Sequence, residues 1–281
     1  MEIKQLNGKA IYSPKGKAGE YAKYACNFYV GCSNDCDYCY CKRGVLGHAM
    51  GGTTPTLKKC FKDESDAYKS FMREVQNNLD KYRKHGIFFT FTSDPLLPET
   101  QQLTNAAVLY AVAQGVPCKL LTKRADFDIP RSFYEHTDLI AFGFTLTGHD
   151  EMERGASTNV ERIEAMRALH KAGFRTFASI EPIIDLKSSA KMIRQTLGFC
   201  DLYKIGLMSG KRNYTPQEVM DFMSDVIRII ILDGSFKLNE RIKVYWKDSV
   251  LDYIKMPRED YNYCAKKSIT VSADYNMFND L

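Results

Sequence analysis

From about residue 21 onward, short runs of β-branched and aromatic residues alternate with longer stretches in which apolar residues recur with helical spacing. The short runs predict strands at residues 24–30, 87–92, 117–122, 139–146, 175–180 and 202–206. The longer stretches predict helices at residues 66–85, 99–115, 129–136, 159–173, 188–198 and 215–233. The pattern therefore indicates a βα unit repeated six times.

Several predicted helices carry end signals. Ser157 and Thr158 precede the helix at 159–173 and are suited to cap its first turn. Glycines follow other helices, where a left-handed backbone can end the helix; they stand at positions 86, 115, 173 and 234.

Repeated βα units require parallel strands, and each crossover helix must cover the outer face of the sheet. A complete eightfold barrel needs about 250 residues, so six units predict an α/β fold with a partial (β/α)6, TIM-like barrel. We expect an N-terminal extension at residues 1–20, the barrel at 21–235 and a C-terminal extension at 236–281 that packs on the barrel. The strand-like residues 241–246 are expected to add an edge strand.

Composition places the chain among ordinary globular proteins, with 281 residues of which 44% are apolar. The first residues do not combine a basic segment with an apolar block, and the longest apolar cluster, residues 226–232, is too short to span a bilayer. We therefore expect a cytoplasmic protein without a membrane partner. Nine cysteines crowded unevenly in such a chain favour reduced thiols over a disulfide framework.

Positive charge is concentrated near the N-terminal end. Residues 1–62 carry ten Lys or Arg against four acidic residues, while the remainder of the chain is close to neutral. These cations are suited to attract a polyanion or a phosphorylated substrate, and they are equally suited to keep the protein in solution.

Polar and reactive residues follow the predicted strands. Because the carboxyl ends of parallel strands meet on one rim, where barrel enzymes build their active sites, we expect these residues to share a site. They are a cysteine-rich segment after the first strand, then Thr92-Ser93-Asp94, Thr122-Lys123-Arg124, Thr145-Leu146-Thr147 with His149 beyond it, Glu181-Pro182 and Met208-Ser209.

Cys32, Cys36 and Cys39 have the spacing C-x3-C-x2-C, with Cys41 two residues further on. Three thiolates on a short loop can converge on one soft metal centre and leave a coordination position open. Structural zinc sites use two separated ligand pairs, and a downstream Cys or His pair with that spacing is missing.

These residues resemble the radical S-adenosylmethionine (radical SAM) superfamily, in which C-x3-C-x2-C with an aromatic residue before the last cysteine, here Tyr38, follows the first barrel strand. The segments "GCSNDCDYCYCKRG", "FTFTSDPLLPET", "LLTKRADF", "GFTLTGHDEMERGAS" and "ASIEPII" are similar to the branch of spore photoproduct lyase and the DNA repair photolyase-like proteins. The resemblance covers roughly residues 20–210.

The resemblance implies a [4Fe–4S] cluster on Cys32, Cys36 and Cys39, with S-adenosylmethionine bound to the remaining iron. It implies that Ser93 and Asp94 bind the methionine moiety, that Lys123 neutralises its carboxylate, and that Tyr38 lies near the adenine. Glu181 is expected near the ribose or the sulfonium.

The chemistry implied is reductive cleavage of the cofactor to a 5′-deoxyadenosyl radical that abstracts hydrogen from a substrate. A reductant such as flavodoxin or ferredoxin is the expected protein partner, and DNA, RNA or a nucleotide is the expected class of substrate.

One position departs from spore photoproduct lyase. That enzyme has a cysteine, its hydrogen donor, before the Thr-Ser-Asp triplet, and this chain has Phe91. A phenyl ring cannot donate that hydrogen, so we expect Tyr40 and Cys41 as the catalytic residues in its place, with Cys26 or Cys118 as further thiols.

Two other functions stay open at this stage. The thiols of Cys32, Cys36 and Cys39, with Cys41 or Cys26, could form a zinc site in a binding module. Alternatively the protein could carry the cluster and bind nucleic acid without turnover, through its basic N-terminal segment.

Overall fold

Strands and helices alternate along the chain as predicted in the computed structural model, which describes residues 9–43, 46–210, 212–232, 242–264, 269–273 and 275–279. The fold class is α/β with a mostly parallel sheet, of the partial-barrel type. The chain forms two compact units: Met1–Ala141 with Met152–Ala156, and Phe142–Glu151 with Ser157–Leu281. The division into a barrel and two extensions stays a prediction.

The first unit contains four strands in the order β1-β2-β5-β6, and β2, β5 and β6 are parallel. β1 pairs antiparallel with β2, and Phe88 of β5 lies opposite Lys119 of β6. A separate antiparallel ribbon joins β3 to β4. The bounds are Ile11–Tyr12 for β1, Ala25–Cys26 for β2, Tyr29–Val30 for β3, Thr56–Leu57 for β4, Ile87–Phe89 for β5 and Cys118–Thr122 for β6.

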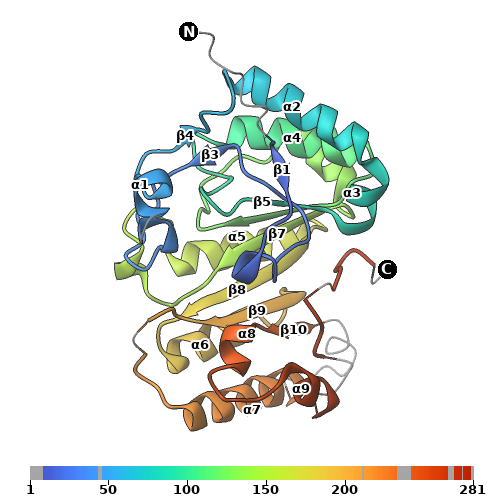
Figure 1. Ribbon diagram of the computed structural model, residues 1–281. Helices are drawn as coiled ribbons and strands as arrows, with labels where there is room; N and C mark the ends of the chain where they lie inside the picture. The colour runs from blue at the N-terminus through green and yellow to red at the C-terminus, as the bar shows by residue number, and fades with distance from the viewer. Residues whose placement is uncertain are drawn as a thin grey trace. The chain divides into compact units, whose positions relative to one another are not determined.

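Helices α2 and α4 lie side by side in this unit (Figure 1). Phe71 of α2 packs on Phe28 and Phe89, with ring centroids 5.8 and 5.9 Å apart, so aromatic side chains join the helix layer to the strands. The helices are α1 (Leu46–Met50), α2 (Glu64–Asn77), α3 (Leu79–His85) and α4 (Gln101–Ala113), with 3₁₀ helices η1 (Gly16–Ala18), η2 (Tyr40–Lys42) and η3 (Arg131–His136).

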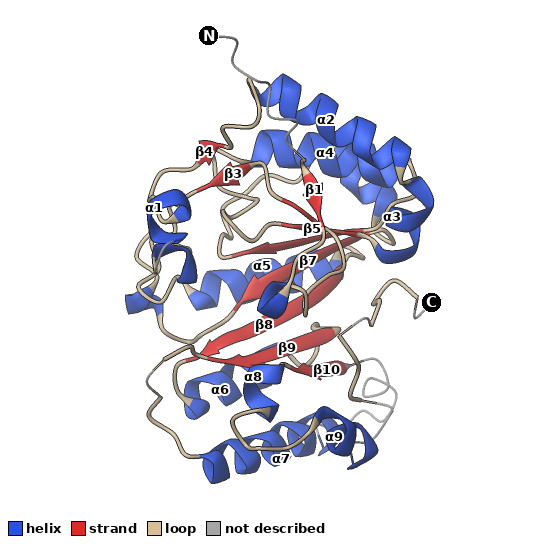
Figure 2. Ribbon diagram, viewed as in Figure 1, coloured by secondary structure: helices blue, strands red, loops and turns tan. Residues whose placement is uncertain are grey.

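The second unit takes most of β7 (Ile140–Thr145) and continues in the strand order β7-β8-β9-β10, in which β8, β9 and β10 are parallel. Helices α6 and α7 lie side by side in it (Figure 2). Its remaining elements are η4 (Asp150–Met152), which ends in the first unit, α5 (Asn159–Lys171), β8 (Arg175–Ile183), α6 (Leu186–Thr196), β9 (Leu202–Leu207), α7 (Pro216–Leu232), β10 (Lys243–Trp246), α8 (Asp248–Leu251) and α9 (Arg258–Cys264).

Helix ends follow the sequence signals. Thr158 and Glu161 form a complete capping box at the start of α5. Gly86, Gly115 and Gly173 have φ values of 69°, 73° and 96°, as their predicted role in ending helices requires. Gly234 lies outside the described residues. In the part of the chain that is described, every helix is too short or too polar to cross a bilayer.

Three predicted elements differ from the structure. The strand predicted at 24–30 is divided into β2 and β3, because Tyr29 and Val30 turn away to pair with β4. The helix predicted at 66–85 is two helices that meet at Asn78, whose φ of −137° is not helical. The helix predicted at 129–136 is the 3₁₀ helix η3. Arg241, in the predicted edge strand, is outside the described residues.

Candidate functional site

The cysteine loop, residues 31–41, lies in the first unit between β3 and η2. Tight backbone turns shape it: the Cys32 amide donates to Gly52 O at 2.9 Å, and the Cys39 amide donates to Cys36 O at 3.3 Å. Cys36 is buried, whereas Cys32 and Cys39 are partly exposed. The three thiols predicted to act together are thus carried by one short, turned segment.

One cation acts on all three thiols. Burial raises the pKa of Cys32 to about 12 and raises the pKa of Cys36. The pKa of Cys39 is lowered, chiefly because the Cys41 thiol hydrogen-bonds to it. The positive charge of Lys123 lowers the pKa of each of the three, so it lies where it stabilises thiolates.

The three cysteine sulfurs of this loop are chemically suited to an iron–sulfur cluster, because such clusters are held by cysteine thiolates. Within the described ranges, no three His, Cys, Asp or Glu side chains are already gathered closely enough to hold a metal ion. The thiols of Cys32, Cys36 and Cys39 would therefore have to turn toward a common point to bind one.

Asp94 ties the cysteine loop to the ends of two strands. Its carboxylate accepts hydrogen bonds from Asn34 Nδ2 (2.7 Å), Leu96 N (3.0 Å), Thr122 Oγ1 (2.7 Å) and Lys123 N (2.7 Å). A carboxylate has about four acceptor sites, so protein donors use this one fully. Asp94 is therefore placed to hold the site together, and its predicted contact with the cofactor stays a prediction.

Two buried polar atoms beside this carboxylate have no hydrogen-bond partner among the described residues: Ser93 Oγ and Asn34 Oδ1. A buried hydroxyl or amide oxygen without a partner costs free energy unless a ligand or water satisfies it. Ser93 was predicted to bind the methionine moiety, and its unsatisfied hydroxyl fits a polar ligand at that position.

Lys123 and Tyr38 lie next to one another. The Lys123 ammonium is 5.4 Å from the centroid of the Tyr38 ring, within the range of a cation–π contact. The Lys123 backbone amide is fixed by Asp94. The loop after β6 thus brings a cation to the cysteine loop, and the predicted contact of Lys123 with the cofactor carboxylate stays a prediction.

Tyr40 and Cys41 converge on the backbone carbonyl of Phe91. The Tyr40 hydroxyl donates to Phe91 O, and Cys41 Sγ lies 3.7 Å from the same oxygen. Tyr40 is 56% exposed, and Cys41 is buried. Both predicted hydrogen donors are therefore held against Phe91.

Two residues of this region were missed by sequence reasoning, Asn34 and Glu153, whereas Arg124 was among the residues expected after the third strand. Asn34 contacts Asp94, and Arg124 donates to Gly155 O. Glu153 is 2% exposed and accepts a hydrogen bond from the Tyr38 hydroxyl. The available signal for both was their place inside the motifs quoted above. Their partners lie far away in sequence, so the contacts could not be predicted from it.

Glu181 belongs to the second unit. Its carboxylate lies 2.7 Å from Lys247 Nζ, and the Lys247 side chain is only 1% exposed. A Cβ at Gly206 would come within 2.8 Å of Glu181 Oε1, so the missing side chain makes room for this ion pair. The predicted contact of Glu181 with the ribose or sulfonium stays a prediction.

His149 has both ring nitrogens engaged in the second unit. Nδ1 is 2.7 Å from Glu151 Oε1, and Nε2 is 2.5 Å from Asp185 Oδ2. Burial acts to lower the pKa of His149, but the hydrogen bonds to the two carboxylates outweigh it and raise the pKa. The two carboxylates therefore favour the protonated, charged form of the ring.

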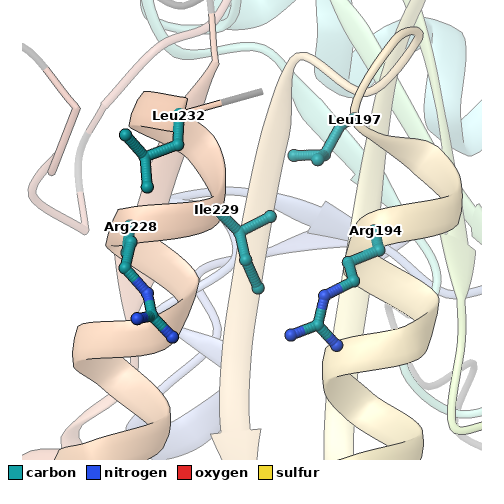
Figure 3. Close-up of a pocket in the computed structure, with 5 residues that line it drawn as sticks. All are labelled: Arg194, Leu197, Arg228, Ile229 and Leu232. Carbon is teal, nitrogen blue, oxygen red and sulfur yellow. The ribbon is translucent and has the colours of Figure 1, made fainter. Parts of the chain in front are cut away.

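A pocket of about 320 Å³ lies between α6 and α7. Figure 3 shows the guanidinium groups of Arg194 and Arg228 pointing toward the same end, with Leu197, Ile229 and Leu232 lining the rest. None of the predicted site residues lines it, and Arg228 pairs with Asp225 at 2.6 Å.

Comparison with known sequences gives one family and one curated relative. A sequence model of the Radical SAM superfamily matches residues 26–200. The uncharacterized protein MJ0683 of Methanocaldococcus jannaschii is 26% identical over 216 residues, which cover 72% of this chain and 76% of the relative.

Solved structures share the fold at low sequence identity. A spore photoproduct lyase mutant with bound AdoMet and dinucleoside spore photoproduct has a TM-score of 0.61 and 13% identity, covering 87% of this chain and 80% of that chain. Streptococcus suis SuiB bound to S-adenosylmethionine has a TM-score of 0.54 and 10% identity, covering 83% of this chain and 52% of that chain.

Proposed function

The chain belongs to the radical SAM superfamily, and on that premise we propose that it is an enzyme that cleaves S-adenosylmethionine reductively with a [4Fe–4S] cluster and abstracts hydrogen from a substrate. The observation that carries the proposal is the cysteine loop, which holds Cys32, Cys36 and Cys39 on one turned segment, with the Lys123 ammonium 5.4 Å from the ring of Tyr38 in the same loop. Three thiolate ligands leave one iron of a cubane cluster open.

In this proposal, different residues of the first unit bind the cluster and the separate parts of S-adenosylmethionine. Cys32, Cys36 and Cys39 would hold the cluster. The Ser93 hydroxyl and the Lys123 ammonium would bind the amino acid part of S-adenosylmethionine, because a carboxylate leaving water needs a cation and hydrogen-bond donors. Tyr38 would lie near the adenine. When bound, the cluster and S-adenosylmethionine supply a carbon-centred radical that takes hydrogen from a substrate carbon.

Asp94 would support this site indirectly, by holding residues that line it. Its four hydrogen bonds fix the Lys123 backbone and the Asn34 side chain, so the loop after β6 and the cysteine loop keep one arrangement. A fixed arrangement of binding groups lowers the entropic cost of bringing reactants together.

The substrate we propose is a nucleic acid or a nucleotide-like molecule. Support comes from the positive charge of residues 1–62 and from the exposed ring of Tyr40 beside the cysteine loop, since an aromatic face can stack on a base. The similar lyase structure contains a dinucleoside spore photoproduct, which is consistent with a substrate of this class.

Hydrogen return differs from that of spore photoproduct lyase in this proposal. Phe91 has no transferable hydrogen, and the S–H of Cys41 and the O–H of Tyr40 are held at its carbonyl. We assign hydrogen return to these two residues. A flavodoxin- or ferredoxin-like protein would supply the electron, and the cytoplasmic location stays a prediction.

The experiment is anaerobic reconstitution with iron and sulfide, followed by addition of dithionite and S-adenosylmethionine. The expected result is a brown protein that produces 5′-deoxyadenosine. A colourless protein that contains zinc would overturn the proposal in favour of a zinc module. A brown protein that binds DNA or RNA in a salt-dependent way, yet forms no 5′-deoxyadenosine, would overturn it in favour of a binding protein.

A further inference from the structure

Residues Met152–Ala156, here called the strap, belong to the first unit although the sequence on both sides of them belongs to the second. The strap is hydrogen-bonded to the cysteine loop at both ends. The Asp37 amide donates to Met152 O at 2.9 Å, and the Gly155 amide donates to Asn34 O at 3.1 Å. The strap thus runs along the middle of the cysteine loop.

The approach of the two segments is close enough to require glycine. A Cβ at position 155 would lie 1.9 Å from Ser33 O, so any other residue would force the strap away from the cysteine loop. Arg124, next to Lys123, donates to the carbonyl of Gly155 from the other side. The strap is therefore held between the cysteine loop and the loop after β6.

Glu153 is the buried centre of the strap. Its backbone forms an isolated antiparallel bridge with Cys36, and its carboxylate accepts the hydrogen bond of the Tyr38 hydroxyl. The residue is only 2% exposed. A buried carboxylate that lost such a donor would be costly, so this contact fixes both partners.

Arg154 makes weaker side-chain contacts with the cysteine loop, to Asp35 and Asp37. Arg154 pairs with Asp37 at 2.7 Å, but the arginine side chain is 65% exposed. Exposed ion pairs contribute at most about 1 kcal/mol. Glu153 is therefore the main side-chain connection between the strap and the cysteine loop.

We propose that Glu153 is a positioning residue that fixes Cys36 and Cys39, two of the three thiols assigned to the cluster. It reaches Cys36 through the backbone bridge and reaches Cys39 through Tyr38, the residue directly before it. Cys32 is held instead by Gly52, outside the strap. The inference rests on the proposed function for its purpose, but its geometry involves only this chain.

The test measures the alkylation rate of each cysteine by iodoacetamide in metal-free protein, read by peptide mass spectrometry. The variants are Glu153→Ala, Glu153→Gln, Tyr38→Phe and the double variant Glu153→Ala with Tyr38→Phe. Glu151→Ala is the matched control, because Glu151 lies two residues before Glu153 and its side chain is 69% exposed. Circular dichroism checks that each variant is folded.

We expect Glu153→Ala to raise the alkylation rates of Cys36 and Cys39 about tenfold while Cys32 changes little, because coupled contacts of this kind have effects of that order. Tyr38→Phe should also raise these rates, and the double variant should be alkylated no faster than the faster of the two single variants. Glu153→Gln should restore slow alkylation of Cys39, since its amide oxygen still accepts the hydrogen bond of Tyr38, whereas the negative charge that acts on Cys36 is lost in both variants. Glu151→Ala should resemble the wild type.

Equal effects of Glu153→Ala and Glu153→Gln on the alkylation of Cys39 would overturn the proposal, because they would show that only the charge of Glu153 matters there. The proposal would also be overturned if the alkylation of Cys32 were accelerated as much as that of Cys36 and Cys39. The same holds if the rate increases caused by Tyr38→Phe and Glu153→Ala multiply in the double variant. If Glu153→Ala does not fold, Tyr38→Phe tests the same link with the carboxylate in place, and unchanged rates would contradict it. Since no cluster is needed, a failure to form 5′-deoxyadenosine would count against the proposed function alone.

Discussion

At the scale of single residues, the cysteines of this chain have different surroundings. Burial raises the pKa of Cys32, Cys36 and Cys118, and the positive charge of Lys123 acts against this rise at Cys32 and Cys36. The pKa of Cys39 is lowered, chiefly by the hydrogen bond from the Cys41 thiol. We expect alanine at any one of the three loop positions to remove the cluster, because two thiolates do not hold a cubane.

The measurement is iron and acid-labile sulfide content after anaerobic reconstitution. Cys60→Ala is the control, since Cys60 is a partly exposed thiol outside the cysteine loop, and it should keep full iron content. Full iron content in Cys32→Ala, Cys36→Ala or Cys39→Ala would remove that residue from the ligand set.

Lys123 offers a second test at this scale. Lys123→Ala removes the ammonium but keeps the backbone amide that Asp94 holds. A charge-assisted hydrogen bond contributes about 1.5–3 kcal/mol, so we expect roughly 10- to 100-fold weaker binding of S-adenosylmethionine by calorimetry, with the cluster absorbance retained. Lys69→Ala, at an exposed position of α2, should bind as the wild type does. Unchanged affinity in Lys123→Ala would contradict the assignment.

At the scale of elements, Asp94 joins the cysteine loop, the turn after β5 and the end of β6. Asp94→Ala would leave several buried donors without an acceptor, at about 1–3 kcal/mol for each unsatisfied group. We expect a loss of at least about 3 kcal/mol in the free energy of unfolding, measured by urea denaturation. Asp225→Ala, which breaks an exposed pair with Arg228, should cost less than about 1 kcal/mol. Equal losses in both variants would show that Asp94 does not join these elements.

His149 links the loop after β7 to Asp185, the N-cap of α6. Its folded pKa is raised by the hydrogen bonds to Glu151 and Asp185, which outweigh burial. A raised folded pKa means that the link stabilises the protein fully below the unfolded value of about 6.5, and that this stabilisation is lost as pH rises through the folded pKa.

We therefore expect His149→Gln to be less stable than the wild type at pH 5.5, with the difference shrinking as pH rises. Thermal unfolding from pH 5.5 to 8.5 measures it. A difference that stays constant over this range, or grows with pH, would show that the charge of His149 does not contribute.

At the scale of the whole molecule, a shared fold does not by itself imply a shared reaction. The resemblance predicts that Phe91 takes the place of the hydrogen-donating cysteine of spore photoproduct lyase, and the ring of Phe91 stacks on Phe88 with centroids 4.5 Å apart. We expect anaerobic assays on DNA containing spore photoproduct to yield little repaired thymine, and Phe91→Cys to raise the yield. Efficient repair by the wild type, lost in Cys41→Ala, would show that Cys41 alone suffices as donor.

Much of the fold was predictable because strands and helices depend on the local period of apolar residues and on local end signals. The capping box at Thr158 and the strands around 118–122 and 202–207 follow from neighbours a few residues apart. The split at Asn78 and the turn of Tyr29 toward β4 were missed, because they depend on partners that are distant in sequence.

The sequence by itself determined the alternation of strands and helices, the cysteine spacing and the family, since these depend on residues within a few positions of one another. Only the tertiary structure decided that four protein donors fill the Asp94 carboxylate, that Tyr40 meets Phe91 and that Glu153 meets Tyr38. The last two residues are 115 positions apart, and a contact over that separation depends on how strands pair and loops pack. No local period of apolar residues encodes it.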